Sequence, residues 1–218
     1  MAKNKKVVKQ RLPIVLASTS PRRIELMKQV GLQFETHSPR TDETPKKNEK
    51  PSALVARLAL QKAQSAVHLA DKKRGPALII AADTIVVEPT GKKILNKPRS
   101  RAEAAKMLKC LQGVTHTVLT GYCILETDPD EREGFSHSHV RVVRSRVTMR
   151  KLSPAQIRTY IATGEPMDKA GAYAAQGIGM ALIEKIDGSY ANVVGLPISQ
   201  VVQDLQEHFD IKVPRLDG

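Results

Sequence analysis

The sequence predicts an α/β protein built on a mixed β-sheet that is flanked by helices. Apolar runs of strand type alternate along the chain with segments of helical periodicity. Some strand candidates follow one another directly as hairpins, so we expect antiparallel as well as parallel neighbours in the sheet. The 218 residues suffice for one large domain or for two small lobes that share a core.

The first two elements are a short strand and a helix. Residues 13–17 form an apolar run of strand type, and apolar residues then recur at helical spacing from Ile24 until Gly31. Between them, Ser20 is an N-cap residue and Pro21 occupies the first helical position. A helix is therefore expected to begin at this point.

The start of this helix has the composition of an anion site. A helix dipole and unpaired backbone N–H groups both favour anions at an N-terminus. Ser18 adds a hydroxyl there, and Arg22 and Arg23 add positive charge. The alternative is an ordinary capped helix with two surface arginines. The rest of the chain favours a site for a polyphosphate.

The remaining elements follow from periodicity, capping and turn residues. Further strands are expected at residues 33–38, 77–82 with a continuation at 85–87, 94–95, 116–125, 139–149 and 178–186. Further helices are expected after a cap at Ser52, over 100–111 and 153–163 with capping boxes, and over 198–209. Polar residues 40–51 and residues 192–197 are expected to be loops.

Asp83 is the most informative single residue because it directly follows the apolar run 77–82. Open α/β sheets place ligands at the carboxyl ends of their strands. An unpaired buried aspartate is unfavourable, so this carboxylate should meet a cation, a metal or water. The equal alternative is a structural aspartate that caps the next turn. Glu43 could supply a second carboxylate from the polar loop, unless it is simply solvated.

Three lysines lie at positions where they could contact a ligand. Lys97 precedes a proline in a tight loop, Lys169 lies in a Gly/Ala-rich stretch, and Lys62 lies on a helix beside small residues. Each alone would be a surface residue, but together with the two arginines they can hold phosphates. Two carboxylates among several cations predict metal-assisted cleavage of a phosphoanhydride with Mg²⁺ or Mn²⁺.

Composition argues against several other classes of protein. Aromatic residues make up 3% of the chain and Trp is absent, so stacking platforms for nucleic-acid bases are poorly supplied. Cys110 and Cys123 form no CxxC pair, which argues against a zinc or disulfide framework. No apolar run approaches the ~20 residues of a membrane span, and no secretion signal precedes the first strand. A cytoplasmic location without membrane contact is the expectation.

The charge is unevenly distributed along the sequence. Of the formal net charge of +13, five positive charges fall within residues 1–11, which leaves +8 for the rest of the chain. Residues 1–11 are expected to be a solvated, poorly ordered arm, followed by a single domain over residues 12–218. Nucleic acid is not an expected partner, except through that arm. The remaining excess suits an enzyme that binds a multiply charged anion.

Several segments together resemble the Maf family of septum-formation-inhibitor-like proteins, which are nucleoside triphosphate pyrophosphatases. They run in family order, and only the basic arm and the loop at 127–137 fall outside the pattern. The matching segments are Leu-Ala-Ser-Thr-Ser-Pro-Arg-Arg at 16–23, Ala-Asp-Thr-Ile-Val at 82–86, Lys-Pro at 97–98, 111–118 with Thr-Gly at 120–121, Asp-Lys-Ala-Gly-Ala-Tyr at 168–173 with Gln-Gly at 176–177, and 188–190 with 194–197.

The resemblance implies two lobes about a deep cleft on a twisted mixed sheet, and often a homodimer. It implies hydrolysis of a nucleoside triphosphate between the α- and β-phosphates, which gives the monophosphate and pyrophosphate. At the matching positions, Asp83 would be the general base for the attacking water and, with Glu43, a neighbour of the metal. The residues that would hold phosphates are Ser18, Arg23, Lys62, Lys97 and Lys169.

Three further positions bear on the base in this family, and here they are Arg22, Thr84 and Gln176. This trio resembles the dTTP/UTP-type subfamily. A glutamine amide both donates and accepts hydrogen bonds, so it can match the edge of a pyrimidine imide. Modified pyrimidine nucleotides such as 5-methyl-UTP and pseudo-UTP present the same edge, which suggests a housecleaning role. Asn96 departs from the family's usual Gly or Glu, outside the phosphate set.

Two alternative functions remain open at this point. The basic arm and the family name suggest a nucleic-acid-binding or cell-division regulatory module. A related fold hydrolyses inosine and xanthosine triphosphates, and Gln176 argues against that activity.

Overall fold

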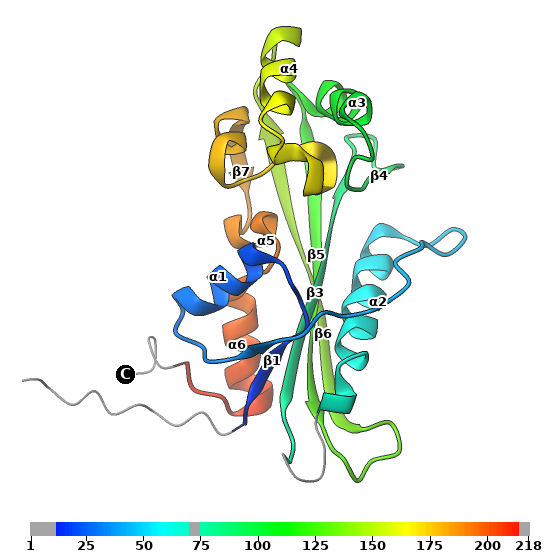
Figure 1. Ribbon diagram of the computed structural model, residues 1–218, viewed down its shortest axis with the longest axis vertical. Coiled ribbons are helices and arrows are strands. Elements are labelled where there is room, and N and C mark those ends of the chain that lie inside the picture. Colours follow the sequence, from blue (N-terminus) through cyan, green and yellow to red (C-terminus); the bar gives the residue numbers. More distant parts are fainter. Residues whose placement is uncertain (1–11, 70–74, 214–218) are drawn as a thin grey trace, which may run out of the picture.

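A seven-stranded mixed sheet runs through the length of the molecule (Figure 1). The structure is a computed structural model, and it describes residues 12–69 and 75–213. The predicted basic arm, residues 1–11, lies outside the described residues. The sheet with helices on both faces confirms the predicted fold class.

The strands are β1 (Ile14–Leu16), β2 (Glu35–Thr36), β3 (Leu78–Val87), β4 (Ile94–Leu95), β5 (Thr115–Thr127), β6 (Phe135–Met149) and β7 (Ile183–Asp187). Their order across the sheet is β2-β1-β3-β5-β6-β7, with β4 paired to β3. β1 is parallel to both β2 and β3, and the remaining neighbours are antiparallel. The predicted hairpin between 116–125 and 139–149 is confirmed as β5 and β6.

The α-helices are α1 (Pro21–Gln29), α2 (Pro51–Gln64), α3 (Arg101–Leu111), α4 (Pro154–Ala162), α5 (Tyr190–Val194) and α6 (Ile198–Phe209). Short 3₁₀ turns add η1 (Val67–Leu69), η2 (Glu165–Asp168), η3 (Ala170–Ala172) and η4 (Gly177–Leu182). Ser20, Ser100 and Ser153 are N-cap residues as predicted, although the Ser20 side chain makes no capping hydrogen bond. The capping box is complete only at Ser153, because the Glu103 carboxylate accepts from the Arg99 N–H and not from the Ser100 N–H. The cap at Ser52 is wrong: Lys50 is the N-cap and Pro51 takes the first helical position, where its fixed φ is favourable.

β3 does not break at Asp83 and Thr84, contrary to the sequence-based expectation. Antiparallel pairing with β5 continues through both residues, from the Leu78–Glu126 pair to the Val87–Thr117 pair. The parallel partner β1, however, ends opposite Ile80. Asp83 therefore lies just beyond the end of the parallel part of the sheet, within a continuous strand.

Helices cover the sheet differently on its two faces (Figure 1). α2 packs on one face, and α1 and α6 pack on the other, while α3 and α4 gather at one end. Gly121 of β5 permits the close approach of α2, because a Cβ there would lie 2.3 Å from the carbonyl oxygen of Val55. Its neighbour Tyr122 is fully buried in the core beneath α6. Consecutive residues of β5 thus serve opposite faces.

Three other sequence-based expectations need correction. The strand expected at 33–38 is only β2. The strand expected at 178–186 begins only at Ile183, because Gly177 has a φ of +70° and η4 precedes β7. The loop expected at 192–197 begins inside α5, which Ser189 caps by accepting a hydrogen bond from the Asn192 N–H at 3.2 Å.

None of the helices in the described ranges is long and apolar enough to cross a membrane.

Candidate functional site

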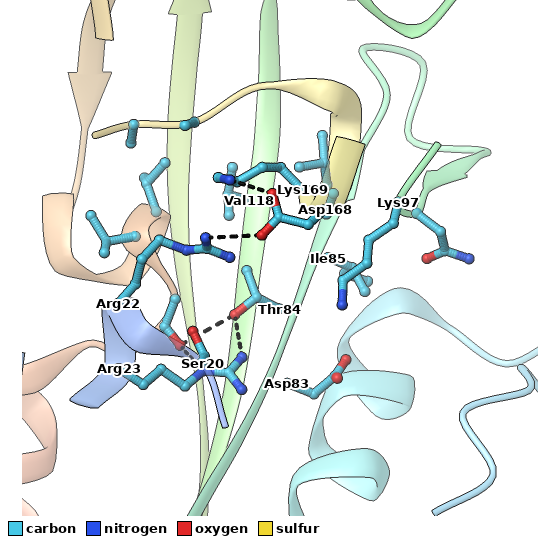
Figure 2. A pocket seen from close by; sticks show the side chains of 18 of the residues that line it. Ser20, Arg22, Arg23, Asp83, Thr84, Ile85, Lys97, Val118, Asp168 and Lys169 are labelled. Atoms are coloured by element: carbon cyan, nitrogen blue, oxygen red, sulfur yellow. Dashed lines mark hydrogen bonds and ion pairs between the residues drawn. The ribbon is translucent and has the colours of Figure 1, made fainter. Parts of the chain in front are cut away.

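A pocket of about 350 Å³ lies beside β3, where β1 ends. It collects side chains from α1, α2, β3, the loop after β4, the η2–η3 segment and α5 (Figure 2). Nine of the ten residues proposed from the sequence line it: Arg22, Arg23, Glu43, Lys62, Asp83, Thr84, Lys97, Lys169 and Gln176. The tenth, Ser18, is buried and supports Arg23.

Lys62 joins the two carboxylates of the pocket. Its Nζ lies 2.6 Å from Oδ1 of Asp83 and 2.6 Å from Oε1 of Glu43. Lys62 and Asp83 are 7% and 8% exposed, so both charges are buried. The expectation that Asp83 meets a cation is confirmed, and the cation is an ammonium from α2.

Glu43 is held in its ionised form. Partial burial alone would raise its pKa, but the hydrogen bond and charge of Lys62 outweigh that effect. The charges of Lys97 and Arg23 act in the same direction, and the pKa of Glu43 falls below its usual value. Glu43 is therefore a carboxylate at neutral pH, and one of its oxygens shares the Lys62 ammonium with Oδ1 of Asp83.

This carboxylate pair is suited to a divalent cation. Two carboxylate oxygens within hydrogen-bond distance of one ammonium face the same small volume. Mg²⁺ and Mn²⁺ prefer oxygen ligands of this kind, usually one or two carboxylates with water and substrate phosphates. The residues present therefore fit the metal that the family resemblance implies.

Arg23 is fixed in place by three hydrogen bonds. Its Nε donates to the carbonyl oxygen of Gly195 at 2.8 Å, Nη1 donates to Ser18 Oγ at 3.3 Å, and Nη2 donates to Thr84 Oγ1 at 3.2 Å. Burial lowers the pKa of Arg23, and the charge of Asp83 opposes that effect. A guanidinium remains charged in proteins, so Arg23 is a half-buried cation, held by hydrogen bonds, that links α1, β3 and the end of α5.

Asp168 pairs with two of the other cations. Its Oδ2 lies 3.5 Å from Nη1 of Arg22, and its Oδ1 accepts a hydrogen bond from the Lys169 ammonium (Figure 2). Burial raises the pKa of Asp168, but Lys169 and Arg22 together hold it below its usual value. The sequence interpretation assigned Lys169 to the site and missed Asp168, although Asp168 lies in the same matching segment.

Lys97 has a different environment from the other pocket lysines. It projects from the loop after β4 towards Asp83 in Figure 2. Within residues 12–69 and 75–213 it forms no ion pair, in contrast to Lys62 and Lys169. Its ammonium is therefore available to an incoming anion.

His116 supports the opposite wall of the pocket. Its Nε2 lies 2.8 Å from the hydroxyl of Tyr173, and Tyr173 lines the pocket. His116, near the start of β5, therefore positions a side chain of the site. Burial lowers the pKa of His116 to about 4, and burial also raises the pKa of Tyr173. The imidazole is therefore neutral at pH 7.

His116 should make the protein less stable as the pH falls from 6.5 towards about 4. The unfolded chain takes up its proton near the upper value, and the folded chain only near the lower one, so unfolding binds a proton between them. The contribution is complete above this window and is lost on acidification, by roughly 1 kcal/mol per pH unit. Urea unfolding at neutral and mildly acidic pH measures the slope.

The control for this pH dependence is another histidine. His116→Gln should flatten the slope, whereas His137→Gln, at an exposed position of β6, should leave it unchanged. An equal slope in wild type and His116→Gln would show that other groups cause the acid sensitivity.

Known proteins resemble the chain over nearly its whole length. A family described as "Maf-like protein" matches residues 13–208. A dTTP/UTP pyrophosphatase of Moorella thermoacetica is 46% identical over 201 residues, which cover 92% of this chain and 96% of that protein. A dTTP/UTP pyrophosphatase of Geobacter sulfurreducens is 44% identical over 193 residues, which cover 88% of this chain and 95% of that protein.

Among solved structures, the Staphylococcus aureus Ham1 protein is 15% identical, with a TM-score of 0.43 and coverage of 93% of this chain and 92% of that one. That similarity is too low to inform function. The family match runs from β1 through the pocket into α6, and both relatives are more than 40% identical over most of the chain. The chain therefore belongs to the Maf-like protein family.

Proposed function

We propose that this protein hydrolyses dTTP, UTP and pyrimidine nucleotides with the same base edge to the monophosphate and pyrophosphate. The observation that carries the proposal is the convergence of five cationic side chains on a pocket that also contains the Glu43–Asp83 carboxylate pair. Such a pocket suits a substrate with several adjacent negative charges. The names of the relatives in Moorella and Geobacter support the same substrates.

The triphosphate would lie between the start of α1 and the lysines of the opposite wall. Arg23 is already oriented by Ser18, Thr84 and Gly195, so little side-chain freedom is lost when it binds a phosphate. Lys97 would bind as a point charge from the other side. Arg22 and Lys169 would exchange their contacts with Asp168 for contacts with phosphate.

Asp83 would act as the general base. A water oxygen attacks the α-phosphorus, and the bond from this phosphorus to the α–β bridging oxygen breaks as pyrophosphate leaves. The water proton passes to the Asp83 carboxylate and then to solvent. Lys62 holds Oδ1 of Asp83 at 2.6 Å and so orients the carboxylate towards the pocket.

We infer that Mg²⁺ or Mn²⁺ assists this reaction and that Glu43 and Asp83 would hold it. When bound, a divalent cation polarises phosphoryl oxygens and stabilises the negative charge that develops on them. Lys62 would then share the two carboxylates with the cation. Its ammonium keeps them together in the free pocket.

The base would be read mainly by Gln176. Its amide can donate to one atom and accept from the next along the edge of a uracil or thymine ring. The hydroxyl of Thr84 already contacts Arg23, Gly195 and Thr120. Thr84 would therefore act by holding Arg23 in place.

A nucleotide panel tests the proposal. With Mg²⁺ or Mn²⁺, we expect pyrophosphate release from dTTP and UTP, and much slower release from ITP and XTP. Gln176→Glu keeps the side-chain shape but removes the amide donor, so it should lower kcat/KM for UTP roughly tenfold or more. Orthophosphate as the first product would contradict α–β cleavage, and a preference for ITP or XTP would favour the alternative substrates.

A further inference from the structure

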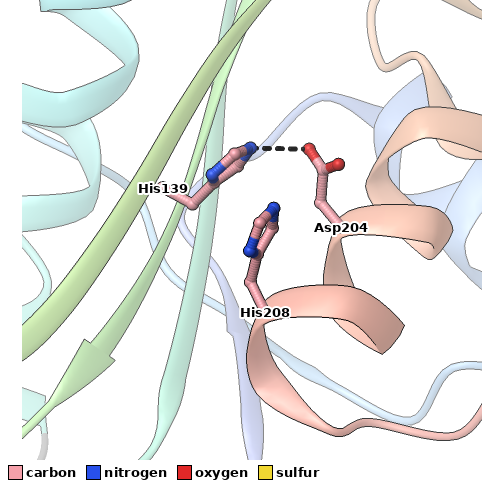
Figure 3. Close-up of side chains that lie close together, drawn as sticks. All are labelled: His139, Asp204 and His208. Atoms are coloured by element: carbon pink, nitrogen blue, oxygen red, sulfur yellow. Dashed lines mark ion pairs between the residues drawn. The ribbon is translucent and has the colours of Figure 1, made fainter.

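A second group of ligand-type side chains lies between β6 and α6 (Figure 3). His139 comes from β6, and Asp204 and His208 lie one turn apart on α6, a spacing that places them on the same helix face. Their potential ligand atoms all lie within 4.8 Å of one another. In Figure 3 a ring nitrogen of each histidine is directed towards the Asp204 carboxylate.

His139 is a partly buried member of this group. Its side chain is 26% exposed, and its ring stacks on His208 with 4.3 Å between centroids. Its Nε2 lies 2.9 Å from Oδ2 of Asp204. Even so, this buried nitrogen has no hydrogen-bond partner of acceptable geometry within the described residues. A buried polar atom without a hydrogen bond is uncommon and indicates a missing partner.

Asp204 is held in position from the other side. It is 1% exposed, its Oδ1 accepts a hydrogen bond from Nη1 of Arg141 at 2.8 Å, and its Oδ2 accepts one from the hydroxyl of Tyr122. Hydrogen bonds of this kind orient the carboxylate ligands of metal sites. The positive charge of Arg141 opposes a cation nearby. However, its side chain is 41% exposed and can turn towards solvent.

None of the three residues of this group lines the pocket described above. Asp83 pairs with Gly121 of β5. A Cβ at Gly121 would point towards α2, so this position lies on the α2 face of the sheet. The next residue, Tyr122, points to the opposite face and contacts Asp204 of α6. The ion pair of Lys62 with Asp83 and the histidine group thus lie on different faces of the sheet, next to consecutive residues of β5.

We propose that His139, Asp204 and His208 form a binding site for a divalent transition-metal cation, with Zn²⁺ as the representative ion. Two imidazoles and one carboxylate are a common ligand set for such ions, with water in the remaining positions. Mg²⁺ prefers oxygen ligands and would not compete well. Because two ligands come from α6 and one from β6, the bound cation would stabilise the packing of α6 on the sheet.

The test is zinc binding by the full-length protein without an affinity tag. Isothermal titration with ZnCl₂ in excess Mg²⁺ should show one site per chain, and Zn²⁺ should raise the melting temperature. His139→Gln and His208→Gln should each weaken binding roughly tenfold or more. His137→Gln is the matched control, because it removes a histidine from the same strand, and it should bind Zn²⁺ like wild type.

X-ray absorption of the wild-type zinc complex provides a readout that needs no variant. Two imidazole nitrogens in the coordination shell would support the site, and a shell of oxygens alone would overturn it. Equal zinc affinity in wild type, His139→Gln and His208→Gln would also overturn it, as would loss of binding in the His137→Gln control. None of these outcomes depends on nucleotide hydrolysis, so they are independent of the proposed enzyme function.

Discussion

Asp83→Asn should lower kcat for UTP by about 10²–10⁴-fold while the nucleotide still binds. The amide is nearly the same size as the carboxylate and can still accept the hydrogen bond of Lys62, but it cannot take a proton from water. At a saturating concentration of Mg²⁺, removal of a negative charge from the pocket should not weaken the binding of a triphosphate. Steady-state pyrophosphate release gives kcat, and calorimetry with a non-hydrolysable UTP analogue gives the affinity.

Asp168→Asn is the matched comparison, because it neutralises a different carboxylate of the same pocket. Asp168 contacts Arg22 and Lys169, so its neutralisation should release these cations and lower KM for UTP. The two variants should therefore differ in the kinetic constant that changes: kcat in Asp83→Asn and KM in Asp168→Asn. A kcat of Asp83→Asn within tenfold of wild type would mean that another group accepts the proton.

Lys62→Met should lower the free energy of unfolding by about 3–5 kcal/mol in the absence of divalent cations. The substitution keeps most of the apolar side chain but leaves Asp83, which is 8% exposed, as a buried carboxylate without its ammonium partner. A buried charge that loses its partner is strongly destabilising. Urea unfolding followed by circular dichroism measures the change.

Two further variants isolate the cause. In Lys62→Met/Asp83→Asn, the uncompensated charge is gone, so most of the lost stability should return. Lys97→Met removes a pocket lysine that has no carboxylate partner among the described residues, and should change stability by less than about 1 kcal/mol. If the single and double Lys62 variants were equally unstable, packing rather than charge would explain the loss.

The parts of the fold that depend on local sequence could be predicted. The caps at Ser100 and Ser153 and the buried run at 77–82 were recognisable because capping and burial leave short-range patterns. The passage of β3 through Asp83 was not, because a charged residue in a strand contradicts local preference. It is stable there because Lys62 of α2 compensates its charge and Gly121 of β5 pairs with it.

The region after α4 was predicted least well. Residues 178–186 contain apolar residues, but Ile178 and Met180 are 57% and 61% exposed, and Gly179 packs against the carbonyl oxygen of Ala174. An apolar run therefore indicated a strand where 3₁₀ turns form. α5 was missed because its five residues are too few for a periodic pattern.

The candidate site was proposed mainly from the order of the matching segments. Its internal contacts were not visible in the sequence, because they join residues far apart along the chain. The hydrogen bonds of Arg23 with Gly195 and of His116 with Tyr173 form only when the chain is folded. Ser18 was expected to hold phosphate, yet its position behind Arg23 suggests that it orients that arginine.

In the free pocket, Asp168 is an internal counter-ion for Arg22 and Lys169. An incoming nucleotide must therefore replace the Asp168 carboxylate as the ion-pair partner of Arg22 and Lys169. A triphosphate carries several negative charges and can displace this one carboxylate from the two cations. A nucleoside monophosphate carries fewer charges, so it competes less effectively with Asp168. If the proposed reaction holds, the return of Asp168 to these two cations would help to expel the monophosphate after each turnover.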